Sequence, residues 1–177
     1  MGRCSGSKWA ADLSHLRGIV AKSVNDVISK AQETEFDLGG RAGGYFCLRE
    51  IDFEKLTISK MLIGKVTNGK DDKYTKLSLE KSTRLHDKYK SDSHELSSQS
   101  RNPDQGEWGG SVKGESLSNR RKFIFSFSGL PEMLDEAAML LAAVRGYCMT
   151  MEYARELAAK SGVSGEGNTF FLENQWD

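Results

Sequence analysis

Ser128 has the setting that most resembles that of a nucleophile, because it ends an alternating aromatic run and precedes a helical pattern. A serine at a strand-to-helix turn is presented for attack in the nucleophile elbow, but that turn needs the pattern G-x-S-x-G. The local sequence Phe127-Ser128-Gly129 lacks it. We therefore expect Ser128 to cap the following helix and not to catalyse a reaction.

The three histidines, His15, His86 and His94, are candidate ligands of haem or of a metal ion. No two of them have the four-residue spacing that places two ligands on one helix face. We expect His15 to pack half-buried beside an apolar helical stripe. His86 is the best candidate for an axial ligand, because a surface helix beside a loop can form the wall of a cleft.

The cysteines and the glycine clusters favour structural roles. Cys4, Cys47 and Cys148 are odd in number and far apart, which argues against a disulfide framework and against a tetrahedral metal site. We expect buried, reduced thiols. The clusters at 39–44 and 109–110 fit neither G-x-G-x-x-G nor a P-loop, so they predict turns and not a phosphate site.

These candidates lie on a predicted order of helix, strand, strand, helix, strand, strand, helix. The pattern predicts an α+β fold, in which one antiparallel sheet of four to five strands has helices packed on it. The strand at 121–128 should be central, with Phe123, Phe125 and Phe127 on one face sealed by the last helix. The expected ranges are helices at 7–35, 73–90 and 131–160 and strands at 45–48, 56–66, 109–115 and 121–128.

Two of these segments carry weaker patterns. The apolar stripe of the helix at 73–90 is thin and rich in lysine, so we expect that helix on the surface of the domain. Residues 91–107 are polar and without periodicity, and predict a long loop or a partly disordered connection.

The 177-residue chain is long enough for one domain with an ordinary core. Lysine plus arginine and aspartate plus glutamate both number 25, and basic residues alternate with acids, so we expect no nucleic-acid partner. No apolar run is long enough to span a membrane. We expect a flexible leader at 1–8, one domain at 9–162 and a tail at 163–177, in a soluble protein of the cytoplasm.

The first residues partly match an acylation signal. Met1-Gly2-Arg3-Cys4-Ser5-Gly6-Ser7 begins like M-G-x-x-x-[ST], with Cys4 as a second acceptor. Glycine occupies the sixth position, where the signal needs a hydroxyl residue. A flexible leader is the preferred interpretation, and lipidation is the alternative.

Several of these features resemble the GlcG/HbpS-like family (DUF336, haem-degrading type) and the related UPF0303 group. The resemblance covers residues 9–148 and includes the αββαββα order, Gly109-Gly110 before a strand, and Ser128-Gly129 followed by Asp135-Glu136. The middle helix matches through Lys81, although Ser82-Thr83-Arg84-Leu85 departs from the family pattern. The resemblance implies a profilin-like fold, higher oligomers and, in some members, haem binding.

Two functions follow as hypotheses. The first is a non-enzymatic or weakly catalytic domain that self-associates and binds haem or another tetrapyrrole. Its ligand-binding candidates are His86, Lys81, Gly109, Gly110 and Ser128. The second is a structural or adaptor subunit of a larger assembly, docking through the final helix and an exposed aromatic tail. Its interface candidates are Phe170, Phe171, Leu172 and Trp176.

Overall fold

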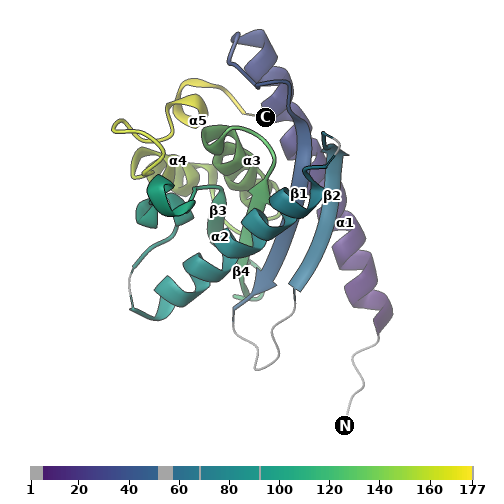
Figure 1. Ribbon diagram of the computed structural model, residues 1–177. Coiled ribbons are helices and arrows are strands. Elements are labelled where there is room, and N and C mark those ends of the chain that lie inside the picture. Colours follow the sequence, from purple (N-terminus) through teal and green to yellow (C-terminus); the bar gives the residue numbers. More distant parts are fainter. Residues whose placement is uncertain (1–5, 52–57, 68, 92, 177) are drawn as a thin grey trace.

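The computed structural model describes residues 6–51, 58–67, 69–91 and 93–176 (Figure 1). The signal-like segment with Gly2 and Cys4, and the predicted strand start at residue 56, lie outside them. The elements are α1 (Gly6–Glu33), β1 (Ala42–Glu50), β2 (Ile58–Lys65), α2 (Asp71–Ser91), η1 (Ser97–Ser100), η2 (Pro103–Gln105), β3 (Ser111–Glu115), β4 (Lys122–Ser128), α3 (Glu132–Arg145), α4 (Met151–Ala159) and α5 (Thr169–Glu173).

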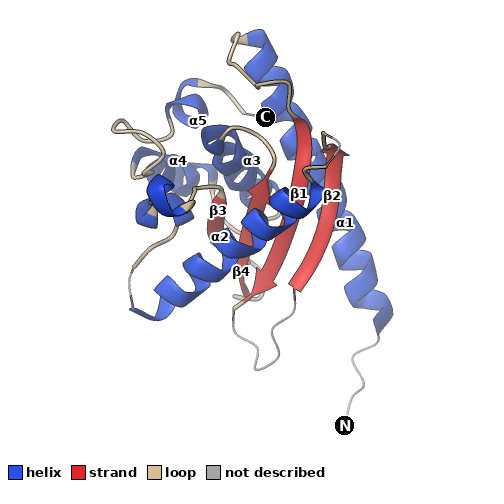
Figure 2. Cartoon of the chain, in the orientation of Figure 1, coloured by secondary structure: helices blue, strands red, loops and turns tan. Residues whose placement is uncertain are grey.

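The four strands form one antiparallel sheet in the order β2-β1-β4-β3, which confirms the predicted α+β class and is consistent with a profilin-like arrangement. The predicted order αββαββα is present and is followed by α4 and α5. In Figure 2, α2 crosses one face of the sheet while α1 and α3 lie on the other. No helix in the described ranges has both the length and the apolar character that a membrane span requires.

The face toward α1 and α3 holds the apolar core. Phe46 of β1 and Phe125 of β4 lie with ring centroids 6.3 Å apart. Phe125 and Phe127 are buried, and Phe123 is partly buried against the same cluster, so the predicted aromatic face is confirmed. Apolar side chains of α1 and α3 cover it: Val20, Val24, Val27, Leu134, Ala137, Ala138 and Leu141.

The helix α2 covers the other face of the sheet with one side, while its other side, with Lys73, Lys76 and Thr83, is exposed, as predicted for a helix on the surface of the domain. Its covering side is richer in buried polar groups than the sequence indicated. Ser111 Oγ donates to Ser126 Oγ at 2.6 Å, and Ser126 Oγ donates to the carbonyl of Ser78 on α2 at 2.6 Å. Ser78, Lys81 and Ser82 of α2 are buried. Hydrogen-bonded polar groups therefore lie beside the thin apolar stripe, of which Tyr74 and Leu85 are buried.

The predicted single last helix is two helices. Tyr147 has a φ of 54°, which ends α3 shortly after Arg145. The turn then pairs with the sheet, since the amides of Glu115 and Leu117 donate to the carbonyls of Cys148 and Tyr147. Thr150 caps α4 by accepting the amide hydrogen of Tyr153.

The described part of the polar segment before β3 is a long loop with two short turns, η1 and η2, which is the first of the two predicted alternatives. The Arg84 guanidinium donates to the carbonyls of Ser97 at 2.7 Å and Trp108 at 2.5 Å. Leu96 is buried and bridges Val112 of β3. One arginine therefore supplies the donors that hold this polar chain against the domain.

The expected exposure of the aromatic tail is also wrong. Phe170 and Phe171 are buried, and the Trp176 ring stacks on Phe171 with centroids 5.7 Å apart. Phe170 also meets Phe36 at 5.4 Å. The predicted tail thus contributes Phe170 and Phe171 to the domain's core, and α1 already begins within the predicted leader, at Gly6.

Candidate functional site

A buried ion pair joins α2 to α3 where β4 ends. Lys81 Nζ lies 2.8 Å from Asp135 Oδ2 and also donates to the carbonyl of Phe127 at 3.0 Å. The other carboxylate oxygen of Asp135 accepts the Leu130 amide hydrogen at 2.8 Å. Both side chains are almost completely buried, so the pair is held in place by backbone groups of the sheet and of the turn.

The electrostatics of the pair are dominated by the loss of water. Burial raises the pKa of Asp135 to about 6, although the Lys81 charge, the hydrogen bonds and the more distant Arg41 oppose the rise. The ionised pair is therefore the form near neutral pH, and mild acid protonates the carboxylate. A titration so close to neutrality marks this corner as a candidate site.

Gly110 makes the room that the pair occupies. Its φ is 115°, and a Cβ there would lie 2.8 Å from Asp135 Cβ and 2.9 Å from Lys81 Nζ. A residue with a side chain would need both the unfavourable backbone conformation and a shift of the pair. The second residue of the predicted Gly-Gly motif is thus required by close packing on Lys81.

A cavity of about 440 Å³ opens beside this pair. Lys81, Ser128 and Asp135 line its floor. Arg41 from the turn before β1, Lys73 from the first turn of α2 and Trp108 from the loop before β3 also line it. Its volume is in the range of small-molecule sites. Basic side chains outnumber acidic ones around it.

The predicted ligand-binding residues divide into two groups. Lys81, Gly110 and Ser128 meet at the cavity, and Gly109 adjoins it, because its amide donates to Glu132 of the wall at 2.5 Å. His86 lies elsewhere, half-buried beside Asp87 with Nδ1 3.3 Å from the carboxylate. Its ring is not part of the cavity wall.

Ser128 does not cap α3 as expected. The helix has Pro131 at its N-cap without a side-chain hydrogen bond, and the free Leu130 amide is taken by Asp135. Ser128 is buried on the floor of the cavity. No histidine lines that cavity, so its hydroxyl has no imidazole base there.

The structure favours neither a metal site nor a reactive thiol among the other candidates that it describes. His15 is exposed on α1 rather than half-buried, and within the described residues no three metal-ligating side chains gather. Cys47 and Cys148 are free and buried, as predicted, and burial raises the pKa of Cys148 to about 11. Such a thiol is a poor nucleophile near neutral pH.

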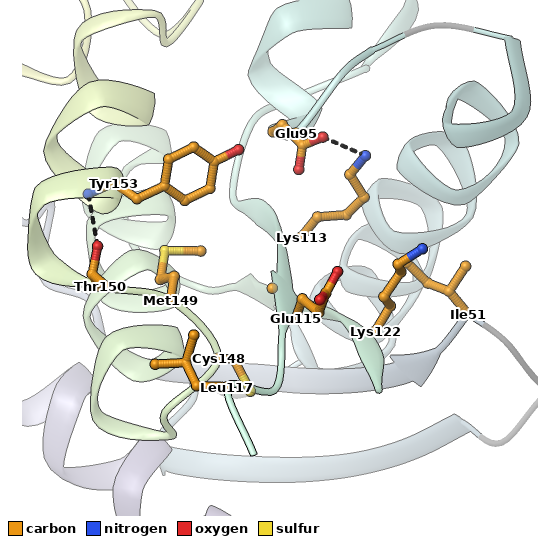
Figure 3. Close-up of a pocket in the computed structure, with 11 residues that line it drawn as sticks. Ile51, Glu95, Lys113, Glu115, Leu117, Lys122, Cys148, Met149, Thr150 and Tyr153 are labelled. Atoms are coloured by element: carbon orange, nitrogen blue, oxygen red, sulfur yellow. Dashed lines mark hydrogen bonds and ion pairs between the residues drawn. The ribbon is translucent and has the colours of Figure 1, made fainter. Parts of the chain in front are cut away.

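A second cavity, of about 510 Å³, lies at the outer edge of β3 (Figure 3). Lys113 and Glu95 form an ion pair of 2.7 Å on one side of it, and the Tyr153 ring points into it from the other. Leu117 and Tyr153 are exposed here, and Tyr147 is exposed beside them. We call these three residues the apolar corner.

Sequence reasoning missed Arg41, Lys73 and Trp108 at the first cavity. Each stands in a segment interpreted by its local pattern: a glycine-rich turn, a solvated helix and a polar loop. Arg41 and Lys73 can bind an anion and Trp108 can pack against a flat ring. No local sequence pattern indicates this, because the three residues meet only in the folded protein.

Compared with known proteins, the chain matches no family model, no curated protein and no solved structure.

Proposed function

We propose that the chain is a non-enzymatic binding domain whose small-molecule site is the cavity beside Lys81 and Asp135. One observation carries the proposal: Lys81 of α2, Ser128 of β4 and Asp135 of α3 share the floor of one cavity of about 440 Å³. Gly110 keeps space for the pair at that floor. The family resemblance singled out the same four residues.

The groups on the floor favour binding over catalysis. Lys81 and Asp135 neutralise each other and are bonded to backbone groups, so neither is free to act as nucleophile or base. A catalytic base needs a partner within hydrogen-bond reach of a reacting atom. Lys81 and Asp135 instead form a rigid polar floor against which a bound molecule would rest.

Haem or another tetrapyrrole is the ligand that the family resemblance implies. No histidine of the described residues lines the cavity to bind its iron, so the site would hold the ring without that axial ligand, and a haemin titration tests the site. We expect a saturable shift of the Soret band with a Kd below about 10 μM. Leu77→Trp, which fills the cavity from α2, should abolish the shift. Leu79→Trp, the same change on a half-buried leucine that lines a different cavity, is the matched control.

Two results of that titration would count against the proposal. A shift that both variants retain would place haemin outside the cavity. No saturable shift, together with no small molecule retained in native mass spectrometry, would remove the binding function.

A role in protein assembly is a second candidate, either as a domain that self-associates or as an adaptor subunit of a larger complex, and the apolar corner favours it. Leu117 is 58% exposed and Tyr147 is 73% exposed, and the Leu117 amide donates to the Tyr147 carbonyl, so the two lie side by side. Exposed neighbouring apolar side chains of this kind mark protein interfaces. The buried tail aromatics could serve such a role only by leaving the core.

Light scattering after size exclusion tests self-association through the apolar corner. We expect an oligomer that Leu117→Lys combined with Tyr147→Lys converts to a monomer. Leu62→Lys is the matched control, because Leu62 is also exposed but lies on β2, at the opposite edge of the sheet. A wild-type monomer at about 100 μM would count against self-association.

A further inference from the structure

We infer that the molecule bound in the Lys81–Asp135 cavity is a small organic anion, with a phosphate or carboxylate head and a flat apolar body. This inference rests on the proposed function, because it assumes that the cavity is the ligand site. It adds the chemical class of the ligand. Three observations carry it: unpaired cations in the wall, acids that are already engaged, and an aromatic side chain beside them.

The acids of the wall are largely neutralised. Asp135 pairs with Lys81 at 2.8 Å. Glu132 pairs with Arg101 at 2.9 Å and accepts the Gly109 amide hydrogen. Asp37, the third acid of the wall, accepts a backbone hydrogen bond from Gly39 at 2.7 Å.

The cations of the wall are not neutralised in the same way. Arg41, Lys70 and Lys73 line the cavity and form no ion pair within the described ranges of the chain. With one exposed acid against three such cations, the cavity attracts a negative ligand and repels a positive one. Arginine can grip a phosphate or carboxylate with two parallel hydrogen bonds, and lysine adds a point charge.

The remaining wall suits a flat apolar group. Trp108 lines the cavity half-buried, and its ring is fixed by the Arg101 guanidinium, 5.5 Å from the ring centroid. Leu77 and Leu130 add aliphatic surface. An inorganic ion would leave this surface unused, so an anion with a ring should bind more tightly than the ion alone.

Calorimetric titration with three probes measures separately what the anionic head and the flat apolar body of the ligand contribute to binding. Phenyl phosphate carries both, inorganic phosphate only the head, and phenol only the ring. We expect phenyl phosphate to bind most tightly, phosphate more weakly and phenol not measurably. The affinity for phenyl phosphate should fall when salt rises from about 20 mM to about 200 mM, because ions screen the exposed cations.

A charge-loss variant with a matched control locates the binding. Arg41→Gln combined with Lys73→Gln should weaken phenyl phosphate by roughly tenfold or more, the loss of one charge-assisted hydrogen bond. Lys76→Gln is the matched control. Lys76 is an exposed lysine of α2 that lines a different cavity, so this change should leave the affinity unchanged. Circular dichroism should show the same fold for all three proteins.

The outcomes distinguish this inference from the proposed function. If haemin saturates the wild type, Leu77→Trp blocks it, and phenyl phosphate does not bind, the binding function stands and the anion inference is overturned. Equal phenyl phosphate affinity in the charge-loss variant and in Lys76→Gln also overturns it. If neither probe binds, the proposed function itself fails.

Discussion

Replacing Glu136 with glutamine tests how the C-terminal segment is held. Glu136 lies on α3 and is fully buried. One carboxyl oxygen accepts from Ser161 Oγ at 2.5 Å and from Asn168 Nδ2 at 3.2 Å, while the other is buried without a hydrogen-bond partner among the described residues. None of the ion pairs of the described chain includes it. Burial therefore raises the pKa of Glu136, and the neighbouring hydrogen bonds oppose this only in part.

The sign of the pH effect follows from this raised pKa. The folded state keeps the Glu136 proton at pH values where the unfolded chain, with a pKa near its ordinary 4.5, has released it. The stability contributed by the neutral form is thus complete below about pH 4.5 and is lost as pH rises through the folded pKa. Between pH 4.5 and the folded pKa, the free energy of unfolding falls by at most about 1.4 kcal/mol for each pH unit. Above the folded pKa, Glu136 causes no further fall.

Glutamine keeps the shape and one carbonyl acceptor but cannot ionise. At acidic pH we expect Glu136→Gln to differ from the wild type by no more than about 1 kcal/mol, because both side chains are neutral there and each leaves one polar group unpaired. As pH rises, the variant should gain stability relative to the wild type. Glu136→Ala, which removes the acceptor of both bonds, should lose about 2–3 kcal/mol at acidic pH, and this loss should shrink as pH rises, because alanine cannot ionise either.

Urea denaturation followed by circular dichroism between about pH 5 and about pH 8 measures these differences. Glu166→Gln is the matched control, because Glu166 belongs to the same C-terminal segment but is exposed. Its stability difference from the wild type should not change with pH. A difference for Glu136→Gln that stays constant over the range, or one that the control shares, would refute the reasoning.

Four further changes test the site and the core. Asp135→Leu should lower the free energy of unfolding by about 3–5 kcal/mol in urea titrations, because Lys81 stays charged and buried without its carboxylate. The double change Lys81→Met with Asp135→Leu should lose less than the two single changes together, and simple additivity would contradict the pairing. Gly110→Ala should lower stability by about 2–4 kcal/mol in thermal melts, because its Cβ would lie 2.8 Å from Asp135 Cβ. Gly106→Ala, at a φ of 74° but in open space, should lower it by about 1 kcal/mol. Equal losses would show that the close approach at Gly110 has no effect. Inorganic sulfate should bind more tightly in calorimetry as pH falls from about 7 to about 5, since protonating Asp135, whose pKa is about 6, removes negative charge from the wall; weaker binding would contradict this. Phe171→Ala should cost about 3–5 kcal/mol in urea titrations, and a loss under about 1 kcal/mol would mean that the tail is not part of the core.

The apolar half of this fold was predictable from the sequence, and the polar half was not. The alternation of Phe123, Phe125 and Phe127 requires one buried sheet face, and the long stripe of α1 requires a partner for its own face. Hydrophobic periodicity finds only a thin stripe on α2, of which Tyr74 and Leu85 are buried. It gives no sign that Ser78 and Lys81 are buried as well, through hydrogen bonds. A helix that covers a sheet with polar groups has the sequence pattern of a surface helix.

The tail shows a different limit of local patterns. The helix α5 has only five residues, too short for a periodic signal, so the aromatics at 170 and 171 seemed exposed. Their burial depends on Asn168, whose side chain caps α5 and also bonds Glu136 of α3. That contact spans 32 residues of chain, and no local window contains both partners.

The candidate site was predictable where one residue carries a distinctive type. Lys81 stood out through the family resemblance and does form the floor of the cavity. Arg41, Lys73 and Trp108 did not stand out, because arginines, lysines and one tryptophan in polar segments are ordinary surface residues. Their meaning depends on the fold, which places them around one opening.

Two features that lower stability coincide at that opening, and this coincidence favours a functional site over a structural one. A buried ion pair is on average no more stabilising than apolar packing of the same volume, so Lys81 and Asp135 are not explained by stability. Gly110, at a φ of 115°, gives up a side chain in order to admit them. If only packing mattered here, two aliphatic residues could replace Lys81 and Asp135, and residue 110 would not need to be glycine. The cavity instead opens at this point, with unpaired cations above the pair. Departures from local rules that gather in one place are characteristic of binding sites, and the corner between α2, β4 and α3 is therefore where ligands should first be sought.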